Sequence, residues 1–181
     1  SVGEVAVAGQ LMRALRAKAP SVRFLMSTTS STGWKQAEKV VAPADVLVYN
    51  PLDFPSSVRR ALAAAEPRAV ILTESEIWPN FIHRAHARGL PLFIVNARVS
   101  DRSAPRYQAL RWWFGPVLRA FTRIFAQSDV DRDRLVAAGA DAAAVEVTGS
   151  FKFDVARRDE AKEQELKTWI GDGEVLLGGS T

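Results

Sequence analysis

The stretch of sequence that decides the fold is AVILTESEIWPNFIHRAHARGLPLFIVN, residues 69–96. It begins with a short apolar run over residues 69–73, which predicts a buried strand, and it ends with a second such run over 92–96. Between the two runs, Pro79 suits the first turn of a helix and Gly89 suits the position just after a helix ends. A strand, a helix and a second strand in this order predict a βαβ unit with parallel strands.

The same alternation of extended and helical patterns continues on both sides of this unit. It predicts an α/β fold, with a Rossmann-like parallel sheet and helices on both of its faces. Thr32 and either Ser56 or Ser57 are expected to cap two of the helices. Further strands are expected at 22–27, 46–49, 123–126, 145–147 and 175–177, and helices at 5–18, 34–41, 56–66, 130–138 and 157–167, with a helix over 105–121 that is kinked or divided at Gly115-Pro116.

The composition is that of an ordinary globular domain. Of the 181 residues, 48% are hydrophobic and 24% are charged, which excludes disordered and collagen-like chains. No run approaches the roughly 18 apolar residues that a membrane-spanning helix needs, and no segment resembles a signal peptide. The chain has no cysteine and two histidines, which excludes disulfides and thiolate chemistry and leaves too few histidines for a metal cage. We therefore expect a soluble chain from a reducing compartment, with no metal site.

Basic residues outnumber acidic ones, and the formal net charge is +4. This balance favours anionic partners such as phosphorylated lipids, nucleic acids or acidic sugars, and the sign alone does not choose among them. Six arginines fall between residues 98 and 123, where Asp101 is the only acidic residue. The stretch is interpreted either as a basic binding face or as ordinary solvated helix surfaces.

Carboxylates stand at two places where an open α/β sheet builds sites. Glu4 begins the first helix, and Glu74 and Glu76 follow the strand over 69–73. The carboxyl ends of parallel strands border the crevice in which such sheets bind ligands. The helix dipole alone would also explain Glu4, and capping of the helix at Pro79 would explain the other pair. Glu74 and Glu76 would point to the same side if the strand continued through them, and would diverge if it ended before them.

Two cations and an aromatic cluster complete the candidate residues. Arg98 follows the strand over 92–96, and Lys152 lies in a glycine-containing loop; both could bind phosphate or form ordinary salt bridges. The run Trp112-Trp113-Phe114 predicts two aromatic rings in the core and one at the surface or at a domain contact, or else a patch beside arginines that meets anionic lipid. Phosphate-binding loops and the serine-nucleophile turn are absent, which disfavours dehydrogenases, nucleoside triphosphatases and serine hydrolases.

Seven short segments, taken in order, resemble the amino-terminal half of 3-deoxy-D-manno-octulosonic acid (Kdo) transferase, which adds Kdo to the lipid A precursor. They are Ser1-Val2-Gly3-Glu4, Ser27-Thr28-Thr29 with Thr32-Gly33, residues 74–80, Asn96-Ala97-Arg98-Val99-Ser100, Ala126-Gln127-Ser128, residues 148–154, and Gly179-Ser180-Thr181. Two positions depart from the family pattern, because Ser75 stands where many members have threonine and Ser150 where many have asparagine.

The resemblance implies the amino-terminal domain of a GT-B type glycosyltransferase with two domains. Residues 1–154 would form the acceptor-side domain, and 155–181 a connecting helix with the start of the donor-binding domain. It implies an inverting transfer of Kdo from CMP-Kdo to lipid IVA, a step of lipopolysaccharide biosynthesis, with Glu4 as general base and no cofactor. This chain alone would be inactive.

The resemblance also assigns the remaining site residues and the setting. One of Glu74 and Glu76 would be a second acidic group of the acceptor site, and the donor contacts would be Gly179, Ser180 and Thr181. The acceptor would be a phosphorylated glucosamine disaccharide lipid, and the parent protein would work at the cytoplasmic face of the bacterial inner membrane, without nucleic acid. The residues expected to bind the acceptor are Gly3, Thr32, Gly33, Arg98 and Lys152.

Two other functions remain open on the residues alone. The first is a non-catalytic binding domain that docks anionic lipid or a protein through its basic face, in which case the arginines matter and Glu4 does not. The second is a different glycosyltransferase with two domains and a nucleotide-sugar donor, which need not contain the segment over 74–80.

Overall fold

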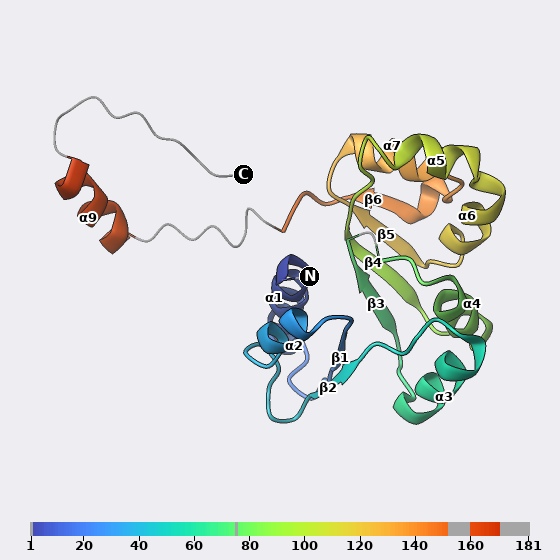
Figure 1. Ribbon diagram of the computed structural model, residues 1–181, viewed down its shortest axis with the longest axis horizontal. Coiled ribbons are helices and arrows are strands. Elements are labelled where there is room, and N and C mark those ends of the chain that lie inside the picture. The colour runs from blue at the N-terminus through green and yellow to red at the C-terminus, as the bar shows by residue number, and fades with distance from the viewer. Residues whose placement is uncertain (1, 75, 152–159, 171–181) are drawn as a thin grey trace. The chain divides into compact units, whose positions relative to one another are not determined.

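The computed structural model describes residues 2–74, 76–151 and 160–170 (Figure 1). The chain divides into two compact units, Ser1–Phe151 and Lys152–Thr181. In the second unit, the described residues form the helix α9 (Glu160–Ile170), on which the Trp169 side chain is 84% exposed. All the site residues that the structure describes belong to the first unit.

Parallel strands organise the first unit. Among its described residues, a sheet of two strands and a sheet of four strands are present, and every strand pair in them is parallel. The first sheet joins β1 (Leu25–Thr28) to β2 (Val46–Tyr49), and the second runs in the order β3 (Val70–Thr73), β4 (Leu92–Ala97), β5 (Arg123–Ala126) and β6 (Val145–Val147).

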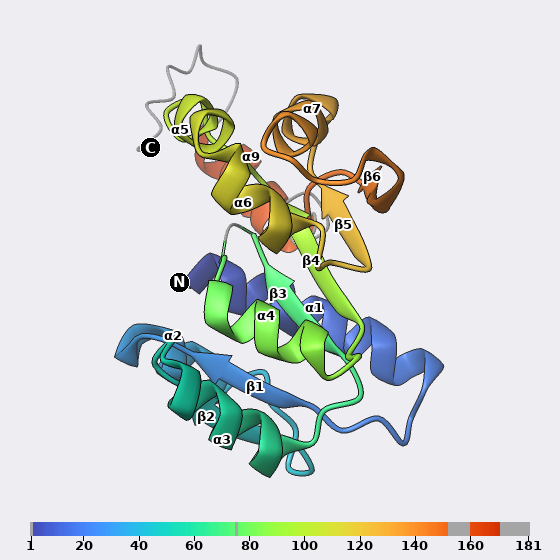
Figure 2. The same cartoon turned by 90° about the vertical axis from the view of Figure 1, so that its right-hand side faces the viewer.

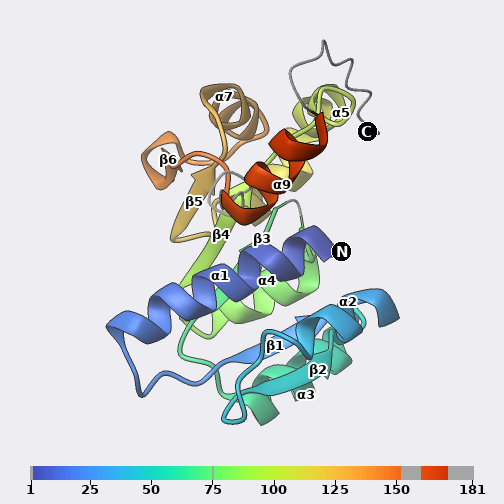
Figure 3. The ribbon, with the colours of Figure 1, turned by 90° about the vertical axis from the view of Figure 1, so that its left-hand side faces the viewer.

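Helices lie on both sides of strand β3. In Figure 2, α4 lies in front of β3 and α1 lies behind it, and Figure 3 shows the reverse from the opposite side. Helix α1 also contacts α2, so it bridges the region between the two sheets. The helices of this unit are α1 (Val2–Lys18), α2 (Ser31–Ala37), α3 (Pro55–Ala65), α4 (Pro79–Ala87), α5 (Ala104–Ala109), α6 (Arg111–Leu118) and α7 (Asp129–Ala137), with a short 3-10 helix at Ala142–Ala144.

Two apolar clusters hold these elements together. The larger one fills the space between the four-stranded sheet and the helices α3, α4, α6 and α7, and the smaller one joins α1 to β1 and α2. Side chains that are at most 2% exposed anchor the larger cluster, among them Ile82, Leu92, Ile94, Leu118 and Ile124. The smaller cluster consists of Val5, Met12, Met26 and Ala37.

The βαβ unit predicted for residues 69–96 is confirmed. Val70 pairs with Leu92, Ile71 with Phe93 and Leu72 with Ile94 in parallel register, and helix α4 connects the two strands. Gly89 has a φ of 71°, the left-handed conformation that glycine adopts most easily after a helix. The α/β class with parallel strands and flanking helices is therefore correct.

The strands form two sheets where one was expected. No strand of the described residues lies between β1 and β3, although α1 contacts both β3 and the first sheet. Leu25 on β1 is 50% exposed and Ile71 on β3 is 38% exposed, which is unusual for apolar side chains of a parallel sheet.

Several local expectations were wrong in detail. Ser30, not Thr32, caps α2, because its Oγ accepts a hydrogen bond from the Gly33 amide at 3.1 Å. Helix α3 begins at Pro55 without a side-chain cap, so neither Ser56 nor Ser57 has the expected role. The segment after residue 104 divides at Leu110 instead of at Gly115-Pro116, because the Leu110 carbonyl accepts the amides of Trp113 and Phe114 and so starts α6.

The bounds of one strand also differ, because the strand expected at 22–27 is Leu25–Thr28. The strand expected at 175–177 lies outside the described residues. No helix in the described part of the chain is long and apolar enough to span a membrane.

Candidate functional site

A hollow of about 150 Å³ lies at the carboxyl ends of β3 and β4. Two of the residues that the sequence singled out, Glu74 and Arg98, line it together. This is the edge of a parallel sheet at which ligands are expected to bind. The complete lining consists of Glu74, Arg98, Val99, Ser100, Ser103 and Tyr107.

Glu74 is placed in the hollow by an abrupt end to strand β3. Its amide donates a hydrogen bond of 2.9 Å to the Val95 carbonyl, which continues the pairing with β4 by one residue. Its φ of 57° then turns the chain into the left-handed region, which costs a residue with a side chain about 1–2 kcal/mol. Glu76 lies beyond this turn and is not among the lining residues. Of the two carboxylates, only Glu74 therefore lines the hollow, and the strand that precedes them ends at Thr73.

Arg98 is the first residue after β4, and its side chain is exposed. The next residue, Val99, is only 3% exposed, so the chain turns inward directly after the arginine. Asn96, two residues earlier, is fully buried with a φ of 55°, and its backbone carbonyl accepts a hydrogen bond of 2.9 Å from Gln127 Nε2. The backbone on the amino-terminal side of Arg98 is therefore bound to Gln127, the residue that directly follows β5.

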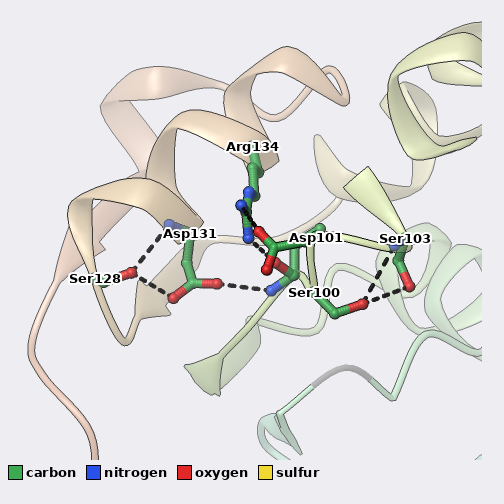
Figure 4. Close-up of polar contacts among 7 residues, drawn as sticks. Ser100, Asp101, Ser103, Ser128, Asp131 and Arg134 are labelled. Carbon is green, nitrogen blue, oxygen red and sulfur yellow. Dashed lines mark hydrogen bonds and ion pairs between the residues drawn. The ribbon is translucent and has the colours of Figure 1, made fainter. Parts of the chain in front are cut away.

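Helix α7 holds the backbone on the carboxyl-terminal side of Arg98 (Figure 4). Asp131 Oδ1 accepts the amide of Val99 at 2.8 Å, and Arg134 Nη1 donates to the Val99 carbonyl at 2.7 Å. Asp131 is only 7% exposed, and its Oδ2 accepts a hydrogen bond of 2.6 Å from Ser128 Oγ. Arg134 also forms an ion pair with Asp101. Asp131 and Arg134 could not be identified from the sequence, because no local pattern links α7 to a loop some thirty residues earlier.

Hydroxyl groups and an aromatic ring complete the lining of the hollow. Ser100 Oγ donates to Ser103 Oγ at 3.0 Å and accepts the Ser103 amide at 3.2 Å, so these two side chains form one turn (Figure 4). Tyr107 stacks on Phe114 with ring centroids 4.2 Å apart. Ser103 and Tyr107 were not predicted as site residues, although they follow Ser100 by three and seven residues, which is helical spacing.

Glu4 lies in the first turn of α1, as the sequence predicted. Gly3 lies in the same turn instead of before the helix, because α1 begins at Val2 and not near residue 5. Glu4 is half-buried and Gly3 is exposed. The amino-terminal end of α1 lies toward the end of β3 from which Glu74 projects, as both side views show (Figures 2 and 3). Glu4 is not one of the residues that line the hollow.

The other predicted site residues lie apart from the hollow or outside the described chain. Thr32 is exposed in the first turn of α2, and Gly33 beside it is buried. A Cβ atom on Gly33 would lie 3.1 Å from Ser30 Oγ, so the glycine allows the cap to close tightly. The positions of Lys152, Gly179, Ser180 and Thr181 fall outside the described residues.

The aromatic run places two rings at the surface instead of one. Phe114 is 9% exposed, whereas Trp113 is 43% exposed and Trp112 is 72% exposed. Trp113 packs edge-on against Phe114 with centroids 4.7 Å apart. The expectation of two rings in the core was therefore wrong, because α6 presents only one of three successive side chains to the sheet.

The chemistry of the hollow suits a polar, anionic ligand. A guanidinium group binds phosphate or carboxylate, and a carboxylate accepts hydrogen bonds from sugar hydroxyls, while serine and tyrosine hydroxyls do either. Within the described residues, no group of three or more histidine, aspartate or glutamate side chains could hold a metal ion.

Comparison with known proteins links this arrangement to one family. A family model described as 3-Deoxy-D-manno-octulosonic-acid transferase (kdotransferase) matches residues 1–155. The chain is 32% identical to 3-deoxy-D-manno-octulosonic acid transferase of Haemophilus influenzae, over 100% of this chain and 43% of that protein. It is 37% identical to the protein of the same name in Bordetella pertussis, over 94% of this chain and 40% of that protein.

The chain therefore spans less than half the length of these two relatives. Among solved structures, it is similar to the UDP-GlcNAc 2-epimerase from Neisseria meningitidis bound to UDP-GlcNAc, with a TM-score of 0.59 and 14% identity, over 95% of this chain and 53% of that one. At this identity the similarity concerns the fold alone.

Proposed function

The chain belongs to the 3-deoxy-D-manno-octulosonic-acid (Kdo) transferase family, and we propose on this premise that it forms the acceptor side of a glycosyltransferase of lipopolysaccharide biosynthesis. The observation that carries the proposal is the hollow at the carboxyl ends of β3 and β4, which Glu74 and Arg98 both line. A site that combines a cation, a carboxylate and hydroxyl groups suits an acceptor that carries both phosphate and sugar hydroxyls.

The reaction is the transfer of Kdo from CMP-Kdo to lipid IVA with inversion. A carboxylate removes the proton from the attacking hydroxyl of the acceptor, the hydroxyl oxygen bonds to the anomeric carbon of Kdo, and CMP leaves with the electron pair of the broken bond. General-base assistance of this kind contributes a factor of about 10² to 10⁴. Glu4 has this role. Its support is the half-buried position in the first turn of α1, toward the end of β3.

The acceptor is held by residues that surround the carboxyl ends of the strands. Arg98 binds a phosphate group of the glucosamine disaccharide, because its planar fork can donate two parallel hydrogen bonds. Glu74, not Glu76, accepts a hydrogen bond from a sugar hydroxyl, since only Glu74 lines the hollow. The remaining acceptor contacts are proposed for Gly3, Thr32, Gly33 and Lys152.

The donor is bound mainly by a second domain. Residues 1–154 are the acceptor-side domain, and residues 155–181 connect it to the donor-binding domain, to which Gly179, Ser180 and Thr181 contribute. The chain of 181 residues alone is inactive. The complete enzyme works at the cytoplasmic face of the inner membrane, where its lipid acceptor is embedded, and it needs no cofactor.

A direct assay tests the proposal. The protein at its full natural length is incubated with CMP-Kdo and lipid IVA, and the Kdo-bearing lipid is measured by mass spectrometry. A parallel reaction uses the acceptor after removal of its phosphate groups. Transfer to the phosphorylated acceptor, with a much higher KM for the dephosphorylated one, is the expected result. Failure of the wild type to transfer Kdo would contradict the proposed activity.

The exposed aromatic side chains favour one alternative, a non-catalytic domain that docks on anionic lipid. Trp112 and Trp113 are 72% and 43% exposed and follow the exposed Arg111, a combination that suits a lipid interface. This alternative predicts binding to anionic vesicles without any transfer of Kdo. The same assay separates the two, since vesicle binding that depends on Trp112 but is accompanied by no product would favour the docking domain.

A further inference from the structure

A single residue of the loop after β4 has both of its backbone polar groups bound by side chains of α7. The amide of Val99 donates to Asp131 at 2.8 Å, and the carbonyl of Val99 accepts from Arg134 at 2.7 Å (Figure 4). The two bonds hold the peptide planes on either side of Val99. Because the peptide bond is planar, the direction of each neighbouring Cα is fixed with them.

The neighbours that are fixed in this way both line the hollow. The peptide before Val99 carries the Cα of Arg98, and the peptide after it carries the Cα of Ser100. Ser100 in turn holds Ser103 through two hydrogen bonds, of 3.0 and 3.2 Å. The contacts from α7 therefore support, through Val99, the backbone that carries three of the residues that line the hollow.

The buried carboxylate of Asp131 needs a physical explanation, because burying a charge costs free energy. A carboxylate that is 7% exposed loses most of its hydration, and it is retained in a folded protein only where donors replace the lost water. Here the donors are the Val99 amide and the Ser128 hydroxyl. Apolar contacts also attach α7 to the core, because Leu135 on the helix and Ala138 directly after it are 2% and 0% exposed.

The neighbouring charges of the same helix make no such contacts. Asp129 and Asp133 are 75% and 70% exposed at their side chains, and both form ion pairs with Arg132. Asp131 and Arg134 thus differ from the other charged residues of α7 in reaching the loop after β4. This contrast provides matched control positions within one helix.

We propose that Asp131 and Arg134 are positioning residues of the acceptor site, which hold Arg98 and Ser100 in the orientation that binds the anionic group of the acceptor. The inference rests on the proposed function, since it assigns the hollow to the acceptor. It adds that the affinity of the site for the acceptor depends on two side chains of α7 that do not line the hollow. Because Arg98 is the cation that binds the anionic group, Asp131 and Arg134 should lose most of their effect on acceptor binding when Arg98 is removed, and only a small effect through Ser100 should remain.

The test is a double-mutant cycle on the protein at its full natural length, with Kdo transfer to lipid IVA as the readout. Arg134→Gln and Asp131→Ala are each combined with Arg98→Ala. Each single variant on α7 is expected to raise the acceptor KM about tenfold, which corresponds to ~1.4 kcal/mol, with little change in kcat. In the Arg98→Ala background the same substitutions are expected to change KM by less than about twofold.

Three controls make the outcome specific. Arg134→Lys keeps a donor for the Val99 carbonyl and is expected to restore most of the acceptor affinity. Asp129→Ala and Asp133→Ala on the same helix are expected to leave KM unchanged. Circular dichroism and thermal unfolding establish that each variant is folded, and Arg134→Gln carries the test if Asp131→Ala does not fold, because the Arg134 side chain is 27% exposed.

The failure of this inference is distinct from failure of the proposed function. The wild type could transfer Kdo while the substitutions on α7 and at Arg98 have additive effects on the acceptor KM. In that case the positioning role is wrong and the proposed function stands. Unchanged KM in folded Arg134→Gln would have the same meaning. If the wild type transfers no Kdo, the proposed function fails and this inference fails with it.

Discussion

The amide of Glu74 donates a hydrogen bond of 2.9 Å to the carbonyl of Val95. This bond carries the pairing of β3 and β4 one residue past the end of β3, and the left-handed φ of 57° at Glu74 then turns the chain away. Glu74 is thereby held at the strand ends, where it lines the hollow together with Arg98, and Glu76 is not among the lining residues. Glu74 and Glu76 are only two residues apart, yet only Glu74 lines the hollow. The backbone hydrogen bond and the φ angle of Glu74 account for its position.

Substitution of the two glutamates should therefore have unequal effects. Glu74→Gln is expected to raise the acceptor KM by about 10- to 100-fold, because a hydrogen bond to a charged group contributes about 1.5–3 kcal/mol. Glu76→Gln should change KM by less than about threefold, as is usual for a residue outside the site. Steady-state kinetics with lipid IVA measures both. Equal losses in the two variants would show that the hollow is not the acceptor site.

Substitutions of Arg98 should show whether it binds the acceptor through two parallel hydrogen bonds or through its charge alone. Arg98→Ala is expected to raise the acceptor KM by about 10- to 100-fold, through loss of charge-assisted hydrogen bonds. Arg98→Lys should recover only part of this loss, because an ammonium group cannot reproduce the planar fork. Arg102→Ala, at an exposed position that does not line the hollow, is the matched control. If Arg102→Ala raises the acceptor KM as much as Arg98→Ala does, the overall basic charge of this region would explain acceptor binding instead.

Asp45 should make the stability of the first unit depend on pH in the acid range. Its side chain is fully buried, and it accepts hydrogen bonds from Arg16 at 2.6 Å and from the amides of Ala42 and Phe24. Burial raises the pKa of this carboxyl, but the Ala42 amide, Arg16 and the Phe24 amide together hold the pKa below its ordinary value of 3.8. The carboxylate form is therefore the one that the folded state favours.

A group whose pKa is lowered on folding stabilises the protein fully above its unfolded-state pKa, and this stability is lost as the pH falls through the folded-state pKa. For Asp45 the loss begins near pH 3.8 and continues below it. Asp45→Asn is expected to lower the free energy of unfolding at pH 7 by about 1–3 kcal/mol and to flatten its decline below pH 4. Urea unfolding at a series of pH values measures both, with the exposed Asp133→Asn as control. Parallel pH curves for wild type and Asp45→Asn would contradict the assignment.

The sequence predicted the parts of the fold that depend on local patterns. The unit over residues 69–96 was predictable because apolar runs, a proline at a helix start and a glycine after a helix end agree with one another. Where two local signals compete, the prediction failed. Ser30 and Thr32 are both residue types that cap helices, and Ser30 is the cap because α2 begins at Ser31, before Thr32. The break at Leu110 depends on how α5 and α6 pack, which no local signal near Gly115-Pro116 reveals.

The candidate site could be predicted only in part, for a related reason. Glu74 and Arg98 were identified because parallel strands place their carboxyl ends at one edge, whatever the rest of the fold does. The chain after β4 brings Ser103 and Tyr107 to the same hollow. Helix α7 brings Asp131 and Arg134 to Val99, in the loop that supports the hollow. These contacts join distant parts of the sequence, so they became visible only in the folded structure.

The measurement that tests the central claim most directly compares wild type with Glu4→Gln in the protein at its full natural length, recording Kdo transfer from CMP-Kdo and binding of lipid IVA separately. The account predicts that Glu4→Gln lowers kcat by about 10² to 10⁴ while the acceptor still binds with nearly its original affinity. Glutamine has the same shape and cannot accept the proton. An unchanged kcat in Glu4→Gln would contradict the account, because the reaction would then use a different base.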